Sequence, residues 1–193
     1  IPRHDAKTFN LSVQYGAKAR KVALTLGKQL IEKQIRDRKT GEWITILVAP
    51  PEVVEMLEAW ENTYSGLMAW RHGQVEFCRR NGYTKTLFGR RRYFPDITHK
   101  INWIRWAAER ACCNHPIQGT AGDIIKIAGK KVKDAWMNEK HRARLLLQIH
   151  DELAAEVRDD FVDQAKSELA SWMTSAVSLS VPLNVEIGAG KNW

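Results

Sequence analysis

Residues 145–157, LLLQIHDELAAEV, decide the fold because they predict a β-hairpin with polar residues at its tip. An apolar run stops at His150, Asp151 and Glu152, and an apolar pattern then resumes. Neighbouring side chains of a strand point to opposite faces, so Asp151 and Glu152 are not expected to hold one ion together. A carboxylate on a short hairpin is firmly held yet exposed, which suits Mg²⁺. A simple polar turn is the alternative.

Helices are predicted on the N-terminal side of this hairpin. Helical periodicity covers residues 3–36 and 52–80, and the break between them, DRKTGEWITILVAPP, contains a turn, a β-prone run and two prolines. A short ribbon is predicted for residues 82–97, where glycines and a proline separate β-formers. Residues 101–119 predict a helix that ends or bends near Pro116.

The remaining elements complete an α+β pattern. A helix is predicted for residues 120–138, and Asp159 and Asp160 suit the N-terminus of a last helix. The buried stripe of that helix is expected to hold Phe161, Ala165, Leu169 and Trp172. The final stretch, PLNVEIGAGKNW, predicts a strand and a terminal loop. Helices therefore dominate, with a small antiparallel sheet.

Composition and charge narrow the class of protein. The chain has 193 residues, of which 44% are hydrophobic and 27% charged, and it has no apolar run long enough to span a membrane. Its three cysteines lack zinc-site spacing, which favours a reducing, cytoplasmic location. The net charge is +8, with ten Lys or Arg against three acids in residues 1–39. Such clustering favours a polyanion partner, with a solvated basic face as the alternative.

A second candidate site lies near the N-terminus. Arg3, Lys7, Leu11 and Tyr15 recur at intervals of four, so they share one face of a helix. Two cations, an apolar residue and a ring in this order could grip a triphosphate, pack a sugar and stack near a base. The alternative is a solvated basic face with Leu11 and Tyr15 in the core.

A third candidate site surrounds the proline of residues 101–119. Arg110 and Asn114 are four residues apart, and Gln118 follows just past Pro116. A guanidinium and two amides in a row suit the minor groove of a nucleic-acid duplex, whose acceptors occur at similar positions for every base pair. Polar groups that cap a helix end are the alternative.

Five stretches resemble, in the same order, the C-terminal part of family A DNA polymerases, the group of bacterial DNA polymerase I and its phage relatives. The stretches are RHDAKTFNLSVQYG, GYTKTLFGRRRYFPDI, ERACCNHPIQGTAGDIIKIA, LLLQIHDELAAEV and VEIGAGKNW. The resemblance implies mostly helical fingers packed on a small antiparallel palm sheet, with fingers in residues 1–81 and palm in residues 82–193. The implied partners are primer-template DNA and a dNTP.

The resemblance also implies a role for each candidate residue. Arg3 and Lys7 would hold the triphosphate, and Lys7 would aid charge neutralisation or protonation of the leaving pyrophosphate. Leu11 would pack on the sugar, and Tyr15 would lie at the insertion site. Contacts to the DNA are implied for Arg110, Asn114, Gln118 and His150. Asp151 would be a catalytic carboxylate that holds Mg²⁺, with Glu152 beside it, in a site of two Mg²⁺ ions.

Three departures from the family pattern stand out. Leu11 occupies a position where the family usually has an aromatic residue. A leucine at this position is better known in phage-type members. The stretch in residues 37–51 is longer than in bacterial members, so an extra ribbon is expected in the fingers. The first catalytic aspartate of the family lies in an upstream motif that has no counterpart here. We therefore expect a nucleotidyltransferase that is incomplete alone and needs an N-terminal polymerase half.

Two other functions stay open. A non-catalytic DNA-binding or scaffold module would keep the basic face without the chemistry, although Lys7, Arg110 and Asp151 all remain in place. A metal-dependent phosphohydrolase built on the His-Asp-Glu tip would leave the other two candidate sites without a role.

Overall fold

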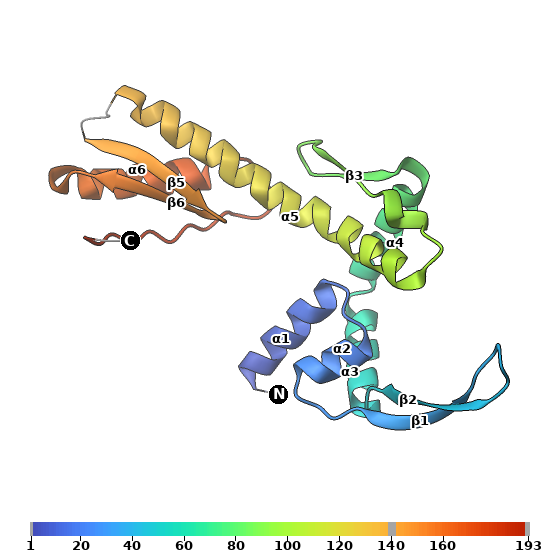
Figure 1. Cartoon of the computed structure of the whole chain (residues 1–193). Coiled ribbons are helices and arrows are strands. Elements are labelled where there is room, and N and C mark those ends of the chain that lie inside the picture. Colours follow the sequence, from blue (N-terminus) through green and yellow to red (C-terminus); the bar gives the residue numbers. More distant parts are fainter. Residues whose placement is uncertain (1, 139–141, 192–193) are drawn as a thin grey trace. The chain divides into compact units, whose positions relative to one another are not determined.

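Helices and two-stranded antiparallel sheets build the chain, as a computed structural model that describes residues 2–138 and 142–191 shows (Figure 1). The predicted α+β class is confirmed. The chain divides into two compact units, residues 1–83 with 94–114 and residues 84–93 with 115–193. The predicted division into fingers, residues 1–81, and palm, residues 82–193, stays a prediction.

The first unit is built around an apolar core of helices. Its elements before residue 82 are α1 (Arg3–Gln14), α2 (Ala19–Thr25), β1 (Ile31–Arg36), β2 (Trp43–Val48), α3 (Pro51–Thr63) and α4 (Ser65–Asn81). One face of each of the first three helices is apolar, and these faces meet in a cluster of Phe9, Val13, Val22, Ala23, Ala49, Val53, Leu57 and Trp60. Burial of these side chains is the main source of stability for this unit.

Two of the predicted helices are wrong in extent. Residues 31–36, predicted as helix, form strand β1, which pairs with β2 along its whole length. The long helix predicted for residues 52–80 is two helices that meet at Tyr64, whose φ of −105° and ψ of 40° leave the helical region. Gly66, two residues further on, lies inside α4, and apolar residues at helical spacing continue on both sides of Tyr64, which is why the sequence predicted one helix.

The extra ribbon expected around residues 37–51 is present, but it begins earlier, since β1 at residues 31–36 is its first strand. β1 and β2 pair from Ile31↔Val48 to Arg36↔Trp43. The carboxylate of Asp37 accepts a hydrogen bond from the backbone N–H of Lys39 at 2.7 Å and so fixes the turn. The indole of Trp43 is 70% exposed near this turn.

One long helix follows the second ribbon. The ribbon consists of β3 (Tyr83–Lys85) and β4 (Arg91–Tyr93), as predicted, and a short 3₁₀ turn leads to α5 (Asn102–Ala135). The prediction of two helices separated near Pro116 is wrong, because α5 continues through the proline. Proline removes one helical N–H donor, but apolar side chains on both sides of it are buried and hold the helix together: Cys112, Cys113, Ile125, Ala128 and Val132.

The second unit packs a hairpin on the end of α5 and on one further helix. Strands β5 (Ala143–Ile149) and β6 (Glu152–Val157) form the predicted hairpin, and α6 (Val162–Thr174) follows a 3₁₀ turn that starts at Asp159. The predicted stripe of α6 is buried or half-buried against Val132, Trp136 and Ala143. The indole of Trp136 donates a hydrogen bond to Glu168 at 2.8 Å.

The predicted C-terminal strand is wrong for residues 182–191, which have no regular secondary structure; residues 192 and 193 lie outside the described residues. A β-prone sequence forms a strand only when its backbone groups pair with a neighbour. In the described chain, the sheet formed by β5 and β6 has no third strand.

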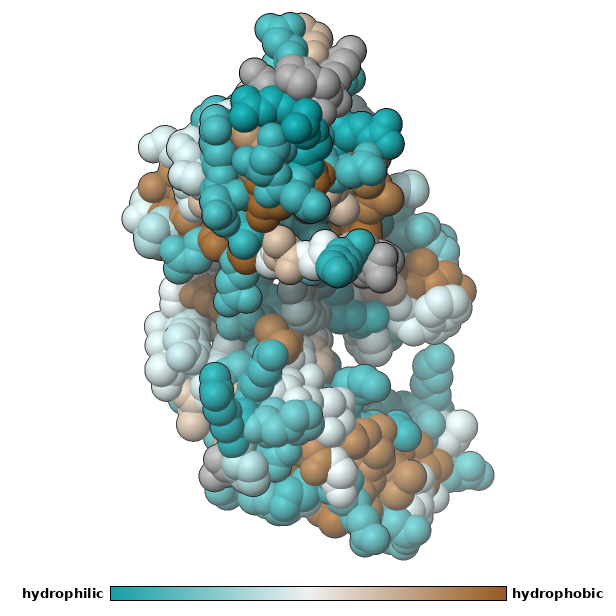
Figure 2. Space-filling model, turned by 90° about the vertical axis from the view of Figure 1, so that its left-hand side faces the viewer, coloured by the Kyte–Doolittle hydropathy of each residue, from teal (hydrophilic) through white to brown (hydrophobic). Residues whose placement is uncertain are grey.

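The surface keeps a number of large apolar side chains in water. Figure 2 shows one face on which hydrophilic side chains predominate and apolar side chains gather in separate patches.

The three cysteines are free and buried. Within residues 2–138 and 142–191, no helix combines the length and the apolar character needed to cross a membrane.

We expect Phe161→Ala to lower the free energy of unfolding of the second unit by about 3–5 kcal/mol, the usual cost of removing a buried ring. Phe161 is 2% exposed and lies in the core of that unit. Urea denaturation measures the change. Leu146→Ala is the control, since Leu146 is 52% exposed. Equal costs for the two variants would contradict the assigned core.

Candidate functional site

The exposed face of α1 carries the first predicted set of residues. Arg3 and Lys7 are exposed, Leu11 is 42% exposed, and Tyr15, the residue that caps the helix, is 44% exposed. The opposite face buries Phe9 and Val13 in the core. The alternative that places Leu11 and Tyr15 in the core is therefore wrong, and the helix presents two cations, a leucine and a phenol ring to solvent.

Two hydrogen bonds from other helices set the rotation of α1 about its axis. The indole of Trp60 donates to the side-chain oxygen of Asn10 at 2.8 Å. The guanidinium of Arg71 donates to the carbonyl of Val13 in the last turn at 3.0 Å. Because a side chain of α3 and one of α4 hold α1 from its buried side, the exposed face has a defined direction within the first unit.

Gly16 lets the end of α1 approach two arginines closely. Its φ of +85° lies in the left-handed region, which favours glycine. A Cβ at this position would lie 2.5 Å from Nη2 of Arg71 and 3.1 Å from Cγ of Arg110. Gly16, which directly follows Tyr15 of the predicted nucleotide set, therefore lies against Arg110 of the predicted DNA set.

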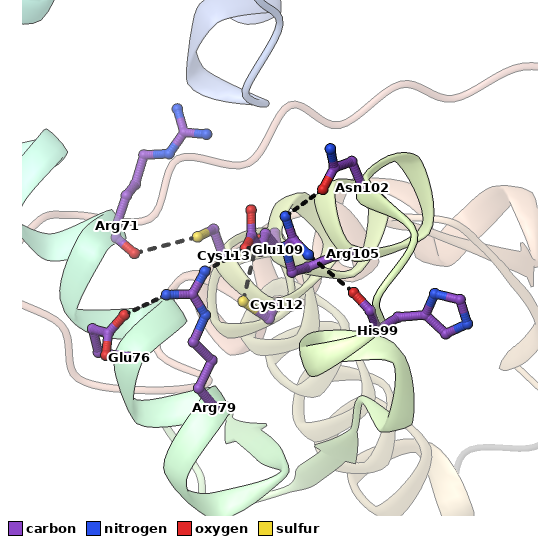
Figure 3. A network of polar contacts seen from close by, with 9 residues as sticks. All are labelled: Arg71, Glu76, Arg79, His99, Asn102, Arg105, Glu109, Cys112 and Cys113. Carbon is purple, nitrogen blue, oxygen red and sulfur yellow. Dashed lines mark hydrogen bonds and ion pairs between the residues drawn. The ribbon is translucent and has the colours of Figure 1, made fainter. Parts of the chain in front are cut away.

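A polar network anchors the first half of α5 to α4 (Figure 3). Glu109 accepts a hydrogen bond from Arg79 at 2.6 Å, and Arg79 also bonds Glu76 at 2.6 Å. Cys113 donates its S–H to the carbonyl of Arg71 at 3.5 Å. Hydrogen bonding with Cys113 and burial raise the pKa of Cys112, so this thiol stays neutral in the core. These contacts fix the face of α5 that looks away from solvent.

The other face of α5 carries the predicted DNA set. Arg110 is exposed and Asn114 is half-buried in the first unit, and Gln118 is exposed on the part of the helix that belongs to the second unit. All three lie inside α5 and repeat every four residues, so they form a stripe along it. They do not cap a helix end, because α5 continues to Ala135.

The turn between β3 and β4 is tied to α5 beside Gln118. Arg90 forms a 2.7 Å ion pair with Asp123 and donates to the carbonyl of Gly119 at 2.9 Å. Burial raises the pKa of Asp123, but hydrogen bonds from Thr86 and Arg90 and the charge of Arg90 outweigh it and hold this pKa below its usual value. Asp123 is therefore a structural carboxylate that keeps Arg90 in place.

A second contact of this turn uses a buried histidine. Thr84 and His115 form a 3.0 Å hydrogen bond, and both side chains are buried. Burial, followed by the charges of Arg90 and Arg92, lowers the pKa of His115. Gly119 leaves room for this packing, since a Cβ there would lie 2.7 Å from a methyl carbon of Thr86.

The hairpin tip is a two-residue turn that presents the predicted carboxylate. Ile149 pairs with Glu152, so His150 and Asp151 form the turn itself. His150 has a φ of +52°, a left-handed conformation that histidine tolerates better than most residues. Gln148 donates to the carbonyl of His150 at 3.0 Å and braces the turn. Asp151 and Glu152 are both exposed.

The described residues contain no complete metal site. Among them, no group of three or more His, Cys, Asp or Glu is placed to hold a metal ion. Asp151 suits Mg²⁺ as one oxygen ligand, because this ion binds few protein carboxylates. A site for two Mg²⁺ ions would need a further carboxylate. Asp151 lies in the second unit, and Lys7 and Arg110 lie in the first, so their meeting at one site stays a prediction.

Several residues that position the site were not found from the sequence. Arg71, Trp60 and Arg90 act through contacts with residues far along the chain. The only local sign was Gly16, a glycine directly after the last residue of the α1 stripe. The left-handed backbone conformation of His150 could not be predicted in this way, because no glycine marks the position.

Comparisons with known proteins agree on one family. The model of DNA polymerase family A matches residues 2–193. The thermostable DNA polymerase I of Thermus filiformis is 38% identical over 191 residues, which cover 99% of this chain and 20% of that protein. The DNA polymerase I of Pseudomonas aeruginosa is 36% identical over 192 residues, which cover 99% of this chain and 19% of that protein.

A solved structure extends this similarity to the fold. The POL domain of Pol1 from M. smegmatis, in complex with DNA primer-template and dNTP, superposes with a TM-score of 0.78 at 32% identity. The match covers 95% of this chain and 29% of that one. The chain spans about a fifth of the length of the curated relatives it matches. These relatives are bacterial, so the likeness to phage-type members stays a prediction.

We expect Gly16→Ala to lower the free energy of unfolding by at least about 1 kcal/mol more than Gly27→Ala does. Both glycines have a positive φ, so each substitution incurs a similar backbone strain of roughly 1–2 kcal/mol. Only Gly16 also has neighbours that a Cβ would meet, whereas nothing lies within 4 Å of a Cβ at Gly27. Chemical denaturation of both variants measures the difference. Equal losses would rule out the close approach.

We expect the stability of the wild type to depend more steeply on acidic pH than that of Asp123→Asn. A lowered folded pKa means that the unfolded state binds the proton more readily. The contribution of Asp123 is therefore complete above the unfolded pKa of about 3.9 and is lost as the pH falls through the folded pKa. Denaturation from about pH 6 to pH 2 measures this, with Asp163→Asn, a fully exposed acid, as the charge control. Parallel curves for wild type and Asp123→Asn would contradict the ion pair.

Proposed function

Because this chain belongs to DNA polymerase family A, we propose that it forms the fingers and part of the palm of a template-directed DNA polymerase. Residues 1–81 would be the fingers and residues 82–193 the palm portion. The solved relative in complex with DNA primer-template and dNTP supports these two as partners of the complete enzyme.

The exposed face of α1 is the observation that carries the proposal. On α1, the exposed Arg3 and Lys7 share a stripe with Leu11 and Tyr15, which are also exposed. The guanidinium and ammonium groups would bind the triphosphate of a dNTP. Leu11 would pack on the sugar, and Tyr15 would lie beside the new base pair.

The chemistry asked of these residues is positioning and charge neutralisation. The primer 3′-oxygen attacks the α-phosphorus, a new P–O bond forms, and the bond to pyrophosphate breaks. Lys7 would neutralise the charge that grows on the leaving pyrophosphate, or would give it a proton. Two Mg²⁺ ions would supply the activation of the 3′-hydroxyl, with Asp151 as one ligand and Glu152 beside it.

The stripe on α5 supports a nucleic-acid duplex as substrate. Arg110, Asn114 and Gln118 would donate to minor-groove acceptors, which occur at similar positions for all base pairs. Such contacts test the shape of the primer-template without reading its sequence. His150, at the hairpin tip next to Asp151, would contact the end of the primer.

A further polymerase segment is proposed as the partner of this chain. Leu146 and Leu147 on β5 are 52% and 47% exposed, which leaves apolar surface on the hairpin uncovered. The chain spans about a fifth of its relatives, and a two-metal site needs a second carboxylate. We propose that an N-terminal polymerase half covers this surface, supplies that aspartate, and acts with this chain in the cytoplasm.

The scaffold alternative differs in one measurable respect. A DNA-binding module without chemistry would keep the basic residues and would not need Asp151. The phosphohydrolase alternative has no observation in its favour, because the hairpin tip offers a single site carboxylate with Glu152 beside it and leaves the stripes of α1 and α5 unused.

We expect the purified chain alone to give no primer extension with Mg²⁺, and the chain joined to an upstream polymerase segment to give templated synthesis. In the joined enzyme, Asp151→Ala should lower the extension rate by at least about a hundredfold, since a metal carboxylate is lost. Asp163→Ala is the matched control, because Asp163 is an exposed acid in the same unit. Gel-based primer extension measures both.

Robust synthesis by the chain alone would refute the need for a partner. An unchanged rate in Asp151→Ala would favour the scaffold. For the nucleotide set, Lys7→Ala should weaken dNTP binding to the joined enzyme, whereas Lys21→Ala, an exposed lysine of α2, should not.

A further inference from the structure

Two large aromatic side chains at the start of α5 lie in water. Trp103 is 69% exposed and Trp106 is 53% exposed. Tryptophan is usually well buried, and its exposed rings are enriched at sites that bind a partner. Neither indole takes part in the polymerase functions proposed above.

The two indoles share a face with the predicted DNA set. On a helix of 3.6 residues per turn, Trp103, Trp106 and Arg110 lie within about 60° of one another. Asn114 continues the same stripe within the first unit. The opposite face buries Ala108 and Cys112, and the network around Glu109 that Figure 3 draws holds it against α4. The packing of α5 therefore aims the tryptophans and Arg110 in one direction.

We propose that Trp103 and Trp106 form a stacking platform for the unpaired bases of single-stranded nucleic acid, next to the duplex contacted by Arg110 and Asn114. This inference rests on the proposed function and names an additional part of the substrate, the single strand beyond the duplex. Bases of any sequence stack on aromatic rings, so such a platform does not select a sequence.

The spacing along the helix suits a nucleotide chain. A rise of about 1.5 Å per residue puts Trp106 and Arg110 roughly 6 Å apart along the axis. A strand advances by about 3.4 Å per nucleotide in a duplex, so the platform begins about two nucleotides from the guanidinium. A base that leaves the duplex near Arg110 could therefore reach the indole of Trp106 within a step or two.

The charges around the platform suit phosphates. Lys100 is exposed just before α5, and Arg110 is exposed one turn after Trp106. Glu109, the nearest acid on the helix, is bound to Arg79 on the other face. Aromatic rings between exposed cations are the pattern that single-stranded nucleic acids bind. An apolar protein surface would instead leave Arg110 and Lys100 without counter-charges.

Binding of a fluorescein-labelled oligothymidine of about 12 nucleotides tests the platform. We expect the double variant Trp103→Ala/Trp106→Ala to bind it about tenfold or more weakly than the wild type, by fluorescence anisotropy. Trp103→Phe/Trp106→Phe should keep most of the affinity, because the rings remain. Trp43→Ala is the matched control, since its indole is 70% exposed on the β1–β2 ribbon. It should bind like the wild type.

Unchanged affinity in the double alanine variant would overturn the inference, and so would an equal loss in Trp43→Ala. Circular dichroism checks that each variant is folded. Binding of blunt duplex separates the two proposals. Loss of single-strand binding with duplex binding retained supports the platform. A chain joined to an upstream polymerase segment that binds the single strand but no primer-template contradicts the polymerase function and leaves the platform standing.

Discussion

The close approach at Gly16 is the constraint on which the candidate site depends. Without a Cβ, the end of α1 lies against the side chains of Arg71 and Arg110, and Arg71 bonds the last turn of α1. Gly16 thus allows the end of α1, the helix proposed to bind a nucleotide, to lie against Arg110 of α5, the helix proposed to bind DNA. A Cβ at this position would meet the side chains of Arg71 and Arg110, so at least one of them would have to shift.

Local periodicity was enough to predict much of this site. The four-residue spacing from Arg3 to Tyr15 implied one face, and that face is exposed because Phe9 and Val13 fill the other. The apolar stretches before and after His150 and Asp151 likewise implied the hairpin. In both cases the deciding information lies within one element, where neighbouring residues fix the direction of each side chain.

The predictions from sequence that are wrong depend on contacts between residues far apart in the chain. Pro116 breaks a local rule, but α5 continues because buried residues on both sides outweigh one lost hydrogen bond. Residues 31–36 pair with strand β2, and the spacing of apolar residues along one segment gives no information about such a partner. The C-terminal β-prone stretch has no partner strand in the described chain. The hydrogen bond of Arg71 and the ion pair of Arg90 connect residues far apart in the sequence, so no local pattern predicted them.

The central proposal is that the cationic stripe of α1 and the carboxylate of Asp151 act on the same bound nucleotide. A structure of this chain joined to an upstream polymerase segment, with primer-template, a non-hydrolysable dNTP and Mg²⁺, tests it most directly. The account predicts Lys7 and Arg3 on the triphosphate and an oxygen of Asp151 in the coordination shell of a metal ion. A triphosphate bound away from α1, or Asp151 without any metal contact, would contradict it.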